Sequence, residues 1–363
     1  MTVHGGDVWQ AGEELGIPAS EILDFSANIN PRGLPHRARE RLARDAANSQ
    51  LLSLYPDPSA RSLRRALSEQ IGVPADAIVV GPGAESLFAP ILRSLRPQRT
   101  LVPIPAFSEY RRVCEQLQIE FVPFLLNRAN WFRVSVDRLC NSIEAERCGL
   151  VLLNNPHNPS GAILTPHEVR GVRGAANSLG ATLLVDEAFV DYVPQASLVH
   201  DAAADHGLIV VRSLTKFYGC PALRVGYAVA HPEVVRQVSS LLPTWPVTQL
   251  AMDALAEAIA DREYAETSLL ENAFERERLG ESLRALGLIV FPSSANYLFL
   301  ELAEGMRGAA ELRQALVQKH RILTRNCDSY EGLTLGRYVR VAVRSATENH
   351  RLIHALGDEL RRS

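Results

Sequence analysis

Short apolar runs without polar alternation constrain the fold of this chain more than any other feature. Such runs are typical of strands that are covered on both faces. Stretches of helical character separate them, as in the segment that begins near Glu85. Alternating strands and helices predict an open, mostly parallel α/β sheet, in which ligands bind beyond the carboxyl ends of the strands. The predicted strands are Ala77–Val80, Thr100–Ile104, Gly149–Leu153, Ala181–Val185, Leu208–Val211 and Val225–Ala230.

The last third of the chain has a different character. Two prolines interrupt the segment Leu241–Pro246. A stretch rich in Ala, Glu and Arg then predicts a long helix from about Thr248 to Leu286, which Gly280 could break. Farther on, a predicted helix separates two strand-like runs. The helix is Gly308–Lys319, and the runs are Ala295–Leu300 and Tyr338–Val343.

These patterns predict three parts. With 363 residues, the chain is long enough for two domains. We expect a large domain over residues 31–245 and a smaller α+β domain over residues 246–363. Residues 1–30 are too few to fold alone, so we expect an arm that packs on the smaller domain or across the mouth of the active site.

Composition and charge argue against several functional classes. The net charge is −3 without any basic block, which disfavours nucleic acid and anionic membranes as partners. The N-terminus lacks a signal-peptide pattern, and no apolar run approaches the ~18 residues of a membrane span, so we expect a cytoplasmic protein. The five cysteines form no C-x-x-C pair, as expected of reduced thiols, and no His- or Cys-rich cluster predicts a metal site.

Lys216 directly follows the strand-like run Leu208–Arg212. A lysine at the mouth of a buried strand is costly unless it is neutralised, paired or used covalently. Two hydroxyls, Ser213 and Thr215, flank it, and Arg224 follows, which together suit a phosphate. An imine-forming lysine beside a phosphate site is what pyridoxal 5'-phosphate (PLP) requires. The competing interpretation is an ordinary loop with a surface lysine and a structural ion pair.

Polar residues also follow two neighbouring predicted strands. Asn158 lies in NNPHNPSG, where prolines restrict the loop, and its amide could hold a phenolate-like oxygen. Asp186 ends another strand and could pair with a protonated ring nitrogen. Glu187 is its competitor, but successive strand residues point to opposite sides, so only one can face a ligand. A proline-rich turn and a solvated loop charge are the alternatives.

The segment GPGAES, residues 81–86, lies between a predicted strand and a helix. Its small residues would let backbone N–H groups approach a phosphate at the helix N-terminus, although most such turns only reverse the chain. Phe107 and Tyr110 follow another strand and could stack on an aromatic cofactor or simply pack in the core. Cys220 lies close to Lys216, and we favour packing over catalysis for its thiol.

Four motifs together resemble the fold-type-I PLP enzymes of the aspartate aminotransferase superfamily over nearly the whole chain. The motifs are NPHNPSG, VDEAF, SLTKFYGCPALRVGY and YVRVAVRS. The resemblance implies that Lys216 forms the imine and later moves a proton, that Asp186 pairs with the pyridine nitrogen and that Asn158 pairs with the ring hydroxyl. The implied phosphate ligands are Ser213, Thr215, Arg224 and the backbone of Gly83, Ala84 and Glu85.

The resemblance also implies a homodimer and narrows the reaction. Tyr55, in LYPDPS, resembles the tyrosine that reaches the cofactor phosphate of the neighbouring subunit. Histidinol-phosphate aminotransferases share the core motifs. The segment from HGG to DFSANINPRGLP, with RSLTKFY and RVAVRSA, is more similar to the L-threonine-O-3-phosphate decarboxylases of cobalamin synthesis. Phe189 occupies the position where many aminotransferases have a tyrosine that donates to the ring oxygen. By the resemblance, the decarboxylases share this phenylalanine.

The decarboxylase branch implies a substrate with two anionic groups. Arg340 resembles the arginine that binds the carboxylate. A regular strand would turn Arg344 to the same side, although its role could be structural. His4 and Arg325 resemble phosphate ligands, with Asn28 near the substrate. The implied reaction converts L-threonine O-3-phosphate to (R)-1-amino-2-propanol O-2-phosphate, for the linker of the cobalamin nucleotide loop. The alternative is transamination of histidinol phosphate with glutamate and 2-oxoglutarate.

Overall fold

Buried apolar strands build the larger part of the molecule. A computed structural model describes the chain from residue 5 to residue 360. The sheet has seven strands in the order β2-β8-β7-β6-β5-β3-β4, and only β8 runs against the others. The predicted mostly parallel sheet is therefore confirmed. Its strands are β2 (Ile78–Gly81), β3 (Arg99–Ile104), β4 (Glu120–Leu125), β5 (Leu150–Asn154), β6 (Thr182–Asp186), β7 (Leu208–Ser213) and β8 (Gly226–Val229).

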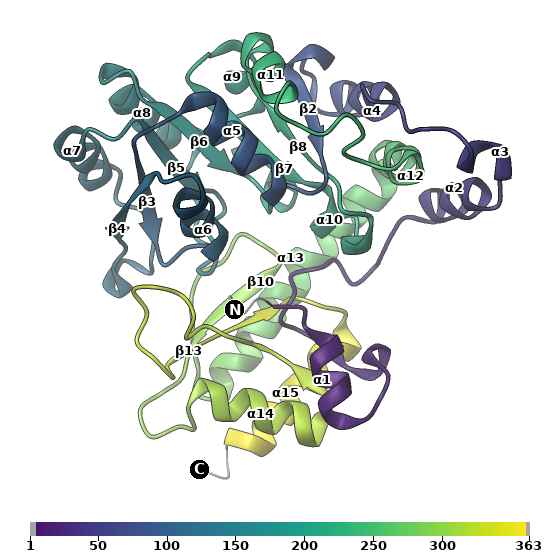
Figure 1. Cartoon of the computed structure of the whole chain (residues 1–363). Helices are drawn as coiled ribbons and strands as arrows, with labels where there is room; N and C mark the ends of the chain where they lie inside the picture. Colours follow the sequence, from purple (N-terminus) through teal and green to yellow (C-terminus); the bar gives the residue numbers. More distant parts are fainter. Residues whose placement is uncertain (1–4, 361–363) are drawn as a thin grey trace.

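Helices cover both faces of this sheet (Figure 1). The α-helices of both parts of the molecule, within the described residues, are α1 (Val8–Leu15), α2 (His36–Ala46), α3 (Ser49–Leu52), α4 (Arg61–Ile71), α5 (Phe88–Leu95), α6 (Ser108–Gln116), α7 (Val136–Glu146), α8 (Pro166–Ser178), α9 (Val199–Ala204), α10 (Leu214–Phe217), α11 (Pro232–Ser239), α12 (Gln249–Ala260), α13 (Arg262–Ala285), α14 (Ala309–His320) and α15 (Ala346–Leu360). Leu150 and Leu152 of β5 pack with α5, α6 and α11, whereas Val151 and Leu153 pack with α7 and α8. Burial on both faces explains why these strands lack polar alternation.

Strand β4 was not predicted, and its position explains why. It lies at the edge of the sheet, where exposed residues such as Glu120 and Leu125 alternate with buried ones. Pro123, in the middle of the strand, also weakens the strand pattern, since proline cannot donate to a neighbouring strand. Pro123 and the exposed edge position therefore explain why this strand was missed.

The smaller part of the molecule is built on an antiparallel sheet in the order β12-β13-β10-β9. Its apolar side packs on α13, α14 and α15. Near the N-terminus, β1 pairs in parallel with β11, and Ile22 packs against Val317. The boundaries at residues 30 and 245 stay predictions. The strands are β1 (Leu23–Asp24), β9 (Ile289–Val290), β10 (Tyr297–Glu301), β11 (Ile322–Leu323), β12 (Arg325–Asn326) and β13 (Tyr338–Ala342).

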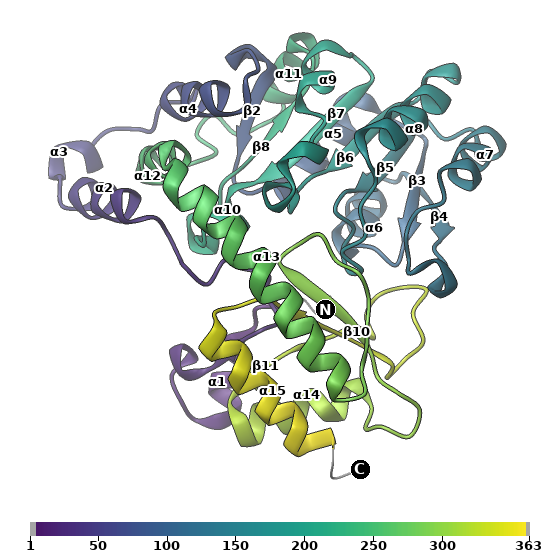
Figure 2. The ribbon, with the colours of Figure 1, turned by 180° about the vertical axis from the view of Figure 1, so that it is seen from behind.

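The predicted long helix is interrupted, but not at Gly280. α12 ends and α13 begins at Asp261, whose carboxylate accepts a hydrogen bond from the backbone N–H of Tyr264 at 2.9 Å and so caps α13. α13 then continues through Gly280, and it spans the distance between the two parts of the molecule (Figure 2). The prediction of a break at Gly280 was wrong because a helix tolerates one glycine at a cost of about 1 kcal/mol.

Two further observations concern the cysteines and the length of the helices. All five cysteines are free; Cys140 is partly buried and the other four are buried. None of the helices that the structure describes between residues 5 and 360 is long and apolar enough to cross a membrane.

Candidate active site

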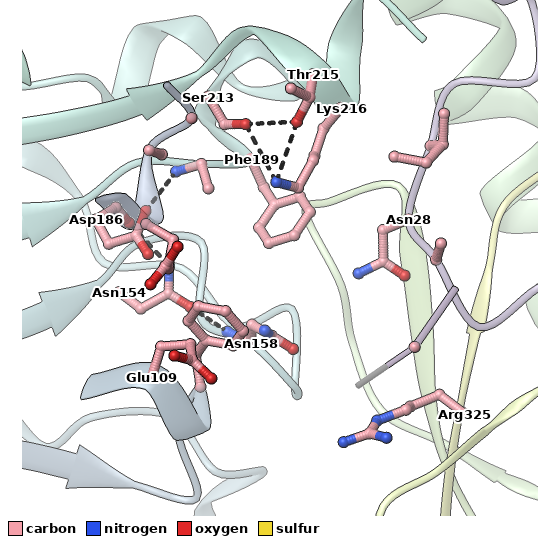
Figure 3. A pocket seen from close by; sticks show the side chains of 18 of the residues that line it. Asn28, Glu109, Asn154, Asn158, Asp186, Phe189, Ser213, Thr215, Lys216 and Arg325 are labelled. Carbon is pink, nitrogen blue, oxygen red and sulfur yellow. Dashed lines mark hydrogen bonds between the residues drawn. The ribbon is translucent and has the colours of Figure 1, made fainter. Parts of the chain in front are cut away.

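A cavity of about 460 Å³ opens where the carboxyl ends of β5, β6 and β7 face the smaller sheet. Figure 3 shows Lys216 and Asp186 on the side of the large sheet, with Asn28 and Arg325 across from them. Tyr55 and Tyr110 do not line this cavity, and His4 lies outside the described residues. The predicted residues that do line it are Asn28, Gly83, Ala84, Glu85, Phe107, Asn158, Asp186, Phe189, Ser213, Thr215, Lys216, Arg224, Arg325 and Arg340.

Lys216 lies on the short helix α10, directly after β7. Its amine donates hydrogen bonds to Ser213 Oγ at 3.1 Å and to Thr215 Oγ1 at 3.3 Å. Burial lowers the pKa of the amine to about 8; the Asp186 carboxylate opposes this shift, and the Arg224 guanidinium adds to it. With this pKa about a tenth of the amine is uncharged at pH 7, far more than for an ordinary lysine, and the uncharged form is the one that can attack a carbonyl.

Cys220, close to Lys216 in the sequence, does not compete with it as a nucleophile. Its thiol donates to the backbone carbonyl of Leu214 at 3.7 Å. Burial raises the pKa of the Cys220 thiol to about 12, so the reactive thiolate is scarce near neutral pH. The geometry therefore favours packing for Cys220.

Asp186 ends β6 and is buried at the floor of the cavity. Its carboxylate accepts hydrogen bonds from the Tyr110 hydroxyl at 2.5 Å and from the backbone N–H of Ala188 at 3.0 Å. Burial raises the pKa of Asp186, and the Tyr110 hydroxyl is the largest opposing influence. Glu187 lies outside the cavity lining and accepts bonds from Ser197 and Leu198. Of the two carboxylates, Asp186 is thus the one available to a ligand.

The sequence left open whether Phe107 or Tyr110 could stack on an aromatic ligand. Phe107 lines the cavity, where an aromatic ligand ring can stack. The Tyr110 ring is almost fully buried and meets Phe107 edge-on, with 5.7 Å between the ring centroids. Tyr110 therefore contacts Asp186 through its hydroxyl and presents no ring face to the cavity.

Asn158 is held by a network of side chains that the sequence did not reveal. Its backbone N–H donates to Asn154 Oδ1 at 2.6 Å, and Asn154 Nδ2 donates to the backbone carbonyl of Asp186 at 2.8 Å. The Tyr330 hydroxyl donates to Asn158 Oδ1 at 3.1 Å. Asn154 lies in the motif NNPHNPSG and was within reach of sequence reasoning. Tyr330 lies in a loop without any pattern that would have singled it out.

His157 stabilises the loop that carries Asn158. Its Nδ1 lies 2.7 Å from Ser160 Oγ, and its Nε2 lies 2.9 Å from the carbonyl oxygen of Pro105. Burial lowers the pKa of His157 to about 4, so the ring is neutral at physiological pH. The imidazole therefore supports the loop and adds no charge to the cavity.

The turn after β2 and the guanidinium of Arg224 form a cradle for an anion. Gly83 has φ +95°, and a Cβ there would lie 2.7 Å from Arg224 Nη2. A Cβ at Gly226 would lie 2.3 Å from the backbone nitrogen of Ala84. Within residues 5–360, Arg224 makes no ion pair with a carboxylate. The cradle, the reactive lysine and the buried Asp186 together fit the phosphate, the aldehyde and the ring nitrogen of PLP.

Two arginines face the cavity from the smaller sheet. Arg325 and Arg340 are register partners on β12 and β13, and each is only 6% exposed. Arg340 donates to the Ser26 carbonyl at 2.8 Å and to Asn158 Oδ1, and Arg325 donates to Ser329 Oγ at 2.7 Å. In the part of the chain that the structure describes, neither forms an ion pair. Buried guanidinium groups without carboxylate partners are suited to anionic ligands.

Arg344 does not join Arg340, because β13 ends at Ala342 and its alternation stops there. A regular strand through both residues was the condition for a shared side, and the structure does not meet it. Arg344 instead donates to the Asp24 carbonyl at 3.1 Å and to Glu348 at 2.7 Å, outside the cavity lining. Its contacts are structural.

One group of possible metal ligands occurs among residues 5–360, although the sequence predicted none. His206, His231 and Glu233 offer ligand atoms within 4.8 Å of one another, outside the cavity. However, His231 Nδ1 already accepts the backbone N–H of Glu233 at 3.3 Å and caps α11. Binding a metal through that nitrogen would remove the cap.

Nearly the whole chain is similar to proteins of one enzyme family. Residues 20–356 match the family described as aminotransferase class I and II. The threonine-phosphate decarboxylase of Salmonella typhimurium is 34% identical over 364 residues, which cover 99% of this chain and 97% of that protein. The adenosylcobalamin biosynthesis bifunctional protein CobDQ of Leptospira interrogans is 31% identical over 360 residues, but this chain spans only 41% of it.

Two further relatives represent the competing activities. The histidinol-phosphate aminotransferase of Methanococcus aeolicus is 27% identical over 98% of this chain and 94% of that protein. The crystal structure of the L-threonine-O-3-phosphate decarboxylase from Porphyromonas gingivalis superimposes with a TM-score of 0.81 at 25% identity, over 94% of this chain and all of that one.

Proposed function

This chain belongs to the aminotransferase class I and II family and uses PLP, and from that premise we propose that it decarboxylates L-threonine O-3-phosphate. The product would be (R)-1-amino-2-propanol O-2-phosphate, a linker for the cobalamin nucleotide loop. The observation that carries the proposal is the pair of buried arginines, Arg325 and Arg340, that face Lys216 without carboxylate partners among residues 5–360. The similarity to threonine-phosphate decarboxylases over nearly the full length supports it.

The proposed substrate matches the charges of the cavity. When bound, PLP withdraws electrons from the bond to Cα that lies perpendicular to its ring. Asp186 would hold the ring nitrogen in its protonated form, and Arg224 with the turn at Gly83 would bind the cofactor phosphate. Lys216 Nζ would carry the proton that Cα receives. Arg340 would bind the carboxylate of the amino acid, which leaves Arg325 for the substrate phosphate.

Two cavity residues refine this assignment. Asn28 Oδ1 is buried and lacks a hydrogen-bond partner in the described part of the chain, which suits a donor on the substrate. Phe189 lines the cavity and packs edge-on against Tyr297, with ring centroids 5.0 Å apart. Because phenylalanine cannot donate, Asn158 would hold the ring oxygen of the cofactor without help from position 189.

The test of the proposed function is release of CO2. Holoenzyme incubated with L-threonine O-3-phosphate, without 2-oxoglutarate, should release CO2 over many turnovers. In Arg325→Gln, we expect KM for this substrate to rise by about ten- to a hundredfold, because a charged hydrogen-bond partner of the phosphate is lost. The matched control is Arg111→Gln, since Arg111 is a surface residue that pairs with Glu331. No CO2 from the wild-type enzyme would refute the proposal.

A second candidate is the transamination of histidinol phosphate. The similarity to a histidinol-phosphate aminotransferase over 98% of the chain favours it, and two arginines can also bind the two carboxylates of glutamate. In that case glutamate alone would convert the cofactor to its amine form, with loss of its visible absorption and without CO2. Both assays can use the same enzyme preparation, so the rate of CO2 release and the rate of cofactor conversion by glutamate can be compared directly.

We also propose that the protein acts as a homodimer. Tyr55 is 78% exposed and stacks on Trp245, with 4.3 Å between the ring centroids, and Leu52 and Leu54, which are close to it in the sequence, are exposed as well. Exposed apolar side chains that gather in this way are typical of interaction surfaces. In the dimer, Tyr55 would reach the cofactor phosphate of the partner subunit.

Light scattering should give twice the chain mass of 39.9 kDa. Leu54→Asp should shift the equilibrium towards monomers, because it places a charge in an apolar contact. Tyr55→Phe should leave the mass unchanged and weaken PLP binding by about tenfold, as expected for the loss of one hydrogen bond to a charged group. A wild-type mass of one chain at micromolar concentration would rule out the dimer.

A further inference from the structure

Tyr330 connects residues that the proposed function assigns to different ligands. It lies in the loop between β12 and β13, and its side chain lines the cavity while remaining only 7% exposed. Two hydrogen bonds restrain this loop: Tyr330 N–H donates to the Cys327 carbonyl at 3.0 Å, and Gly336 N–H donates to Asp328 Oδ1 at 2.6 Å. The ring therefore has a defined place in the wall of the cavity.

The hydroxyl of Tyr330 lies between Arg340 and Asn158. Arg340 Nη1 lies 3.1 Å from the Tyr330 oxygen, and that oxygen lies 3.1 Å from Asn158 Oδ1. A guanidinium can only donate, so Tyr330 accepts from Arg340. Its own proton is then free to be donated to Asn158. The direction of both hydrogen bonds follows from the chemistry of the three groups.

This chain of hydrogen bonds determines how the Asn158 amide is turned. Both Arg340 Nη1 and the Tyr330 hydroxyl donate to Asn158, which places the carbonyl oxygen of the amide on their side. The amide nitrogen Nδ2 is used in none of the hydrogen bonds within residues 5–360 and is left for a ligand in the cavity. Asn158 therefore presents a donor, as a phenolic oxygen requires.

The ring of Tyr330 also contacts Arg325. The Arg325 guanidinium carbon lies over the ring, 5.4 Å from its centroid, which is within the range of a cation–π contact. One side chain thus touches both arginines and the asparagine.

We propose that Tyr330 is a positioning residue that turns the Asn158 amide towards the ring oxygen of the cofactor and holds Arg340 in place for the carboxylate of the substrate. The inference rests on the proposed role of Asn158 and not on which amino acid is the substrate. It also explains how a single asparagine can serve the ring oxygen while phenylalanine stands at position 189. Without Tyr330, the amide would keep one donor, Arg340, and would be held less firmly in this orientation.

The first test is a pH titration of the visible absorption of the bound cofactor, without amino acid. A donor to the ring oxygen disperses its negative charge and weakens its hold on the adjacent proton. In Tyr330→Phe that donor is less well oriented, so we expect the midpoint of the titration to rise by about one pH unit, the equivalent of one hydrogen bond to a charged group. In an Asn158→Ala background, Tyr330→Phe should leave the midpoint unchanged.

The second test separates positioning from a general loss of structure. With the amino acid substrate, Tyr330→Phe should raise KM by about tenfold and change kcat by less than about threefold, because Arg340 loses a contact that orients it. The matched control is Tyr338→Phe on β13, a buried tyrosine that does not line the cavity, which should keep both the midpoint and KM.

Three results would overturn the inference: an unchanged midpoint in Tyr330→Phe, an equal shift in the Asn158→Ala background, or an equal shift in Tyr338→Phe. The titration contains no substrate, so its result is independent of the CO2 assay. Absence of CO2 release would refute the proposed reaction and leave the positioning role of Tyr330 standing.

Discussion

Replacing Lys216 with alanine will reduce turnover by about 10⁴-fold and remove the visible absorption of the covalently held cofactor. The reason is that burial lowers the pKa of the Lys216 amine in the cavity to about 8, so far more of it is uncharged near neutral pH than of an ordinary lysine. Ser213 and Thr215 contact this amine but cannot form an imine. The position of the amine at the end of β7 therefore accounts for its role.

The composition of the chain makes this prediction unusually easy to test. The sequence contains two lysines, Lys216 and Lys319. Lys319 lies on α14, partly exposed, and pairs with Glu359 at 2.9 Å. Borohydride reduction of the holoenzyme followed by peptide mass spectrometry should attach the cofactor at Lys216, and Lys319→Ala should retain both the label and full activity. A label at Lys319, or turnover retained by Lys216→Ala, would contradict the assignment.

Replacing Arg212 with methionine will lower the free energy of unfolding by about 3–5 kcal/mol, the range for breaking a buried ion pair. Arg212 directly precedes Ser213 and is 5% exposed. It donates to Asp191, and its Nε lies 3.9 Å from Glu187 Oε2. Without the guanidinium, the buried carboxylate of Glu187 and the partly buried carboxylate of Asp191 lose their shared cation. The loss should appear as a lower urea midpoint.

The deficit of Arg212→Met should grow as the pH rises. Burial already raises the pKa of Glu187 to about 7, despite the opposing charge of Arg212, and it raises the pKa of Asp191 as well. A carboxyl whose pKa is higher in the folded state takes up protons on folding, so its contribution to stability is lost as the pH rises from about 4.5 through 7. Removing Arg212 strengthens this effect because the charged forms become still less favourable.

Two further variants make the Arg212 prediction specific. Combining Arg212→Met with Glu187→Gln and Asp191→Asn should recover most of the stability, since no buried charge then lacks a partner. Arg61→Met removes an exposed pair with Asp57 and should cost less than about 1 kcal/mol. A loss of the same small size for Arg212→Met would contradict this prediction. In the wild type, the contacts of Arg212 join β7 to the residues that follow β6, directly beside Asp186 and Ser213.

Much of the site could be predicted from the sequence because its residues follow strands that are buried on both faces. The carboxyl ends of parallel strands meet at one edge of a sheet, so the sequence pattern alone predicts that Asn158, Asp186 and Lys216 lie together. The sequence pattern predicted the elements less well where tertiary packing determines their boundaries. The break in the long helix lies at Asp261, not at Gly280, and β4 at the sheet edge was not predicted.

The sequence by itself determined the class of sheet, the cofactor and the residues beside it, since strand periodicity and short motifs are local properties. Tertiary structure alone decided how those residues are held. Tyr110 proved to be the donor to Asp186, and Tyr330 meets Asn158 across 172 residues of chain. The first contact depends on how α6 packs on the larger sheet, and the second arises only when the smaller sheet packs over the carboxyl edge of the larger one; no local pattern encodes either approach. Which hydrogen-bond donors surround Asn158 and Asp186 is therefore a property of the packed molecule.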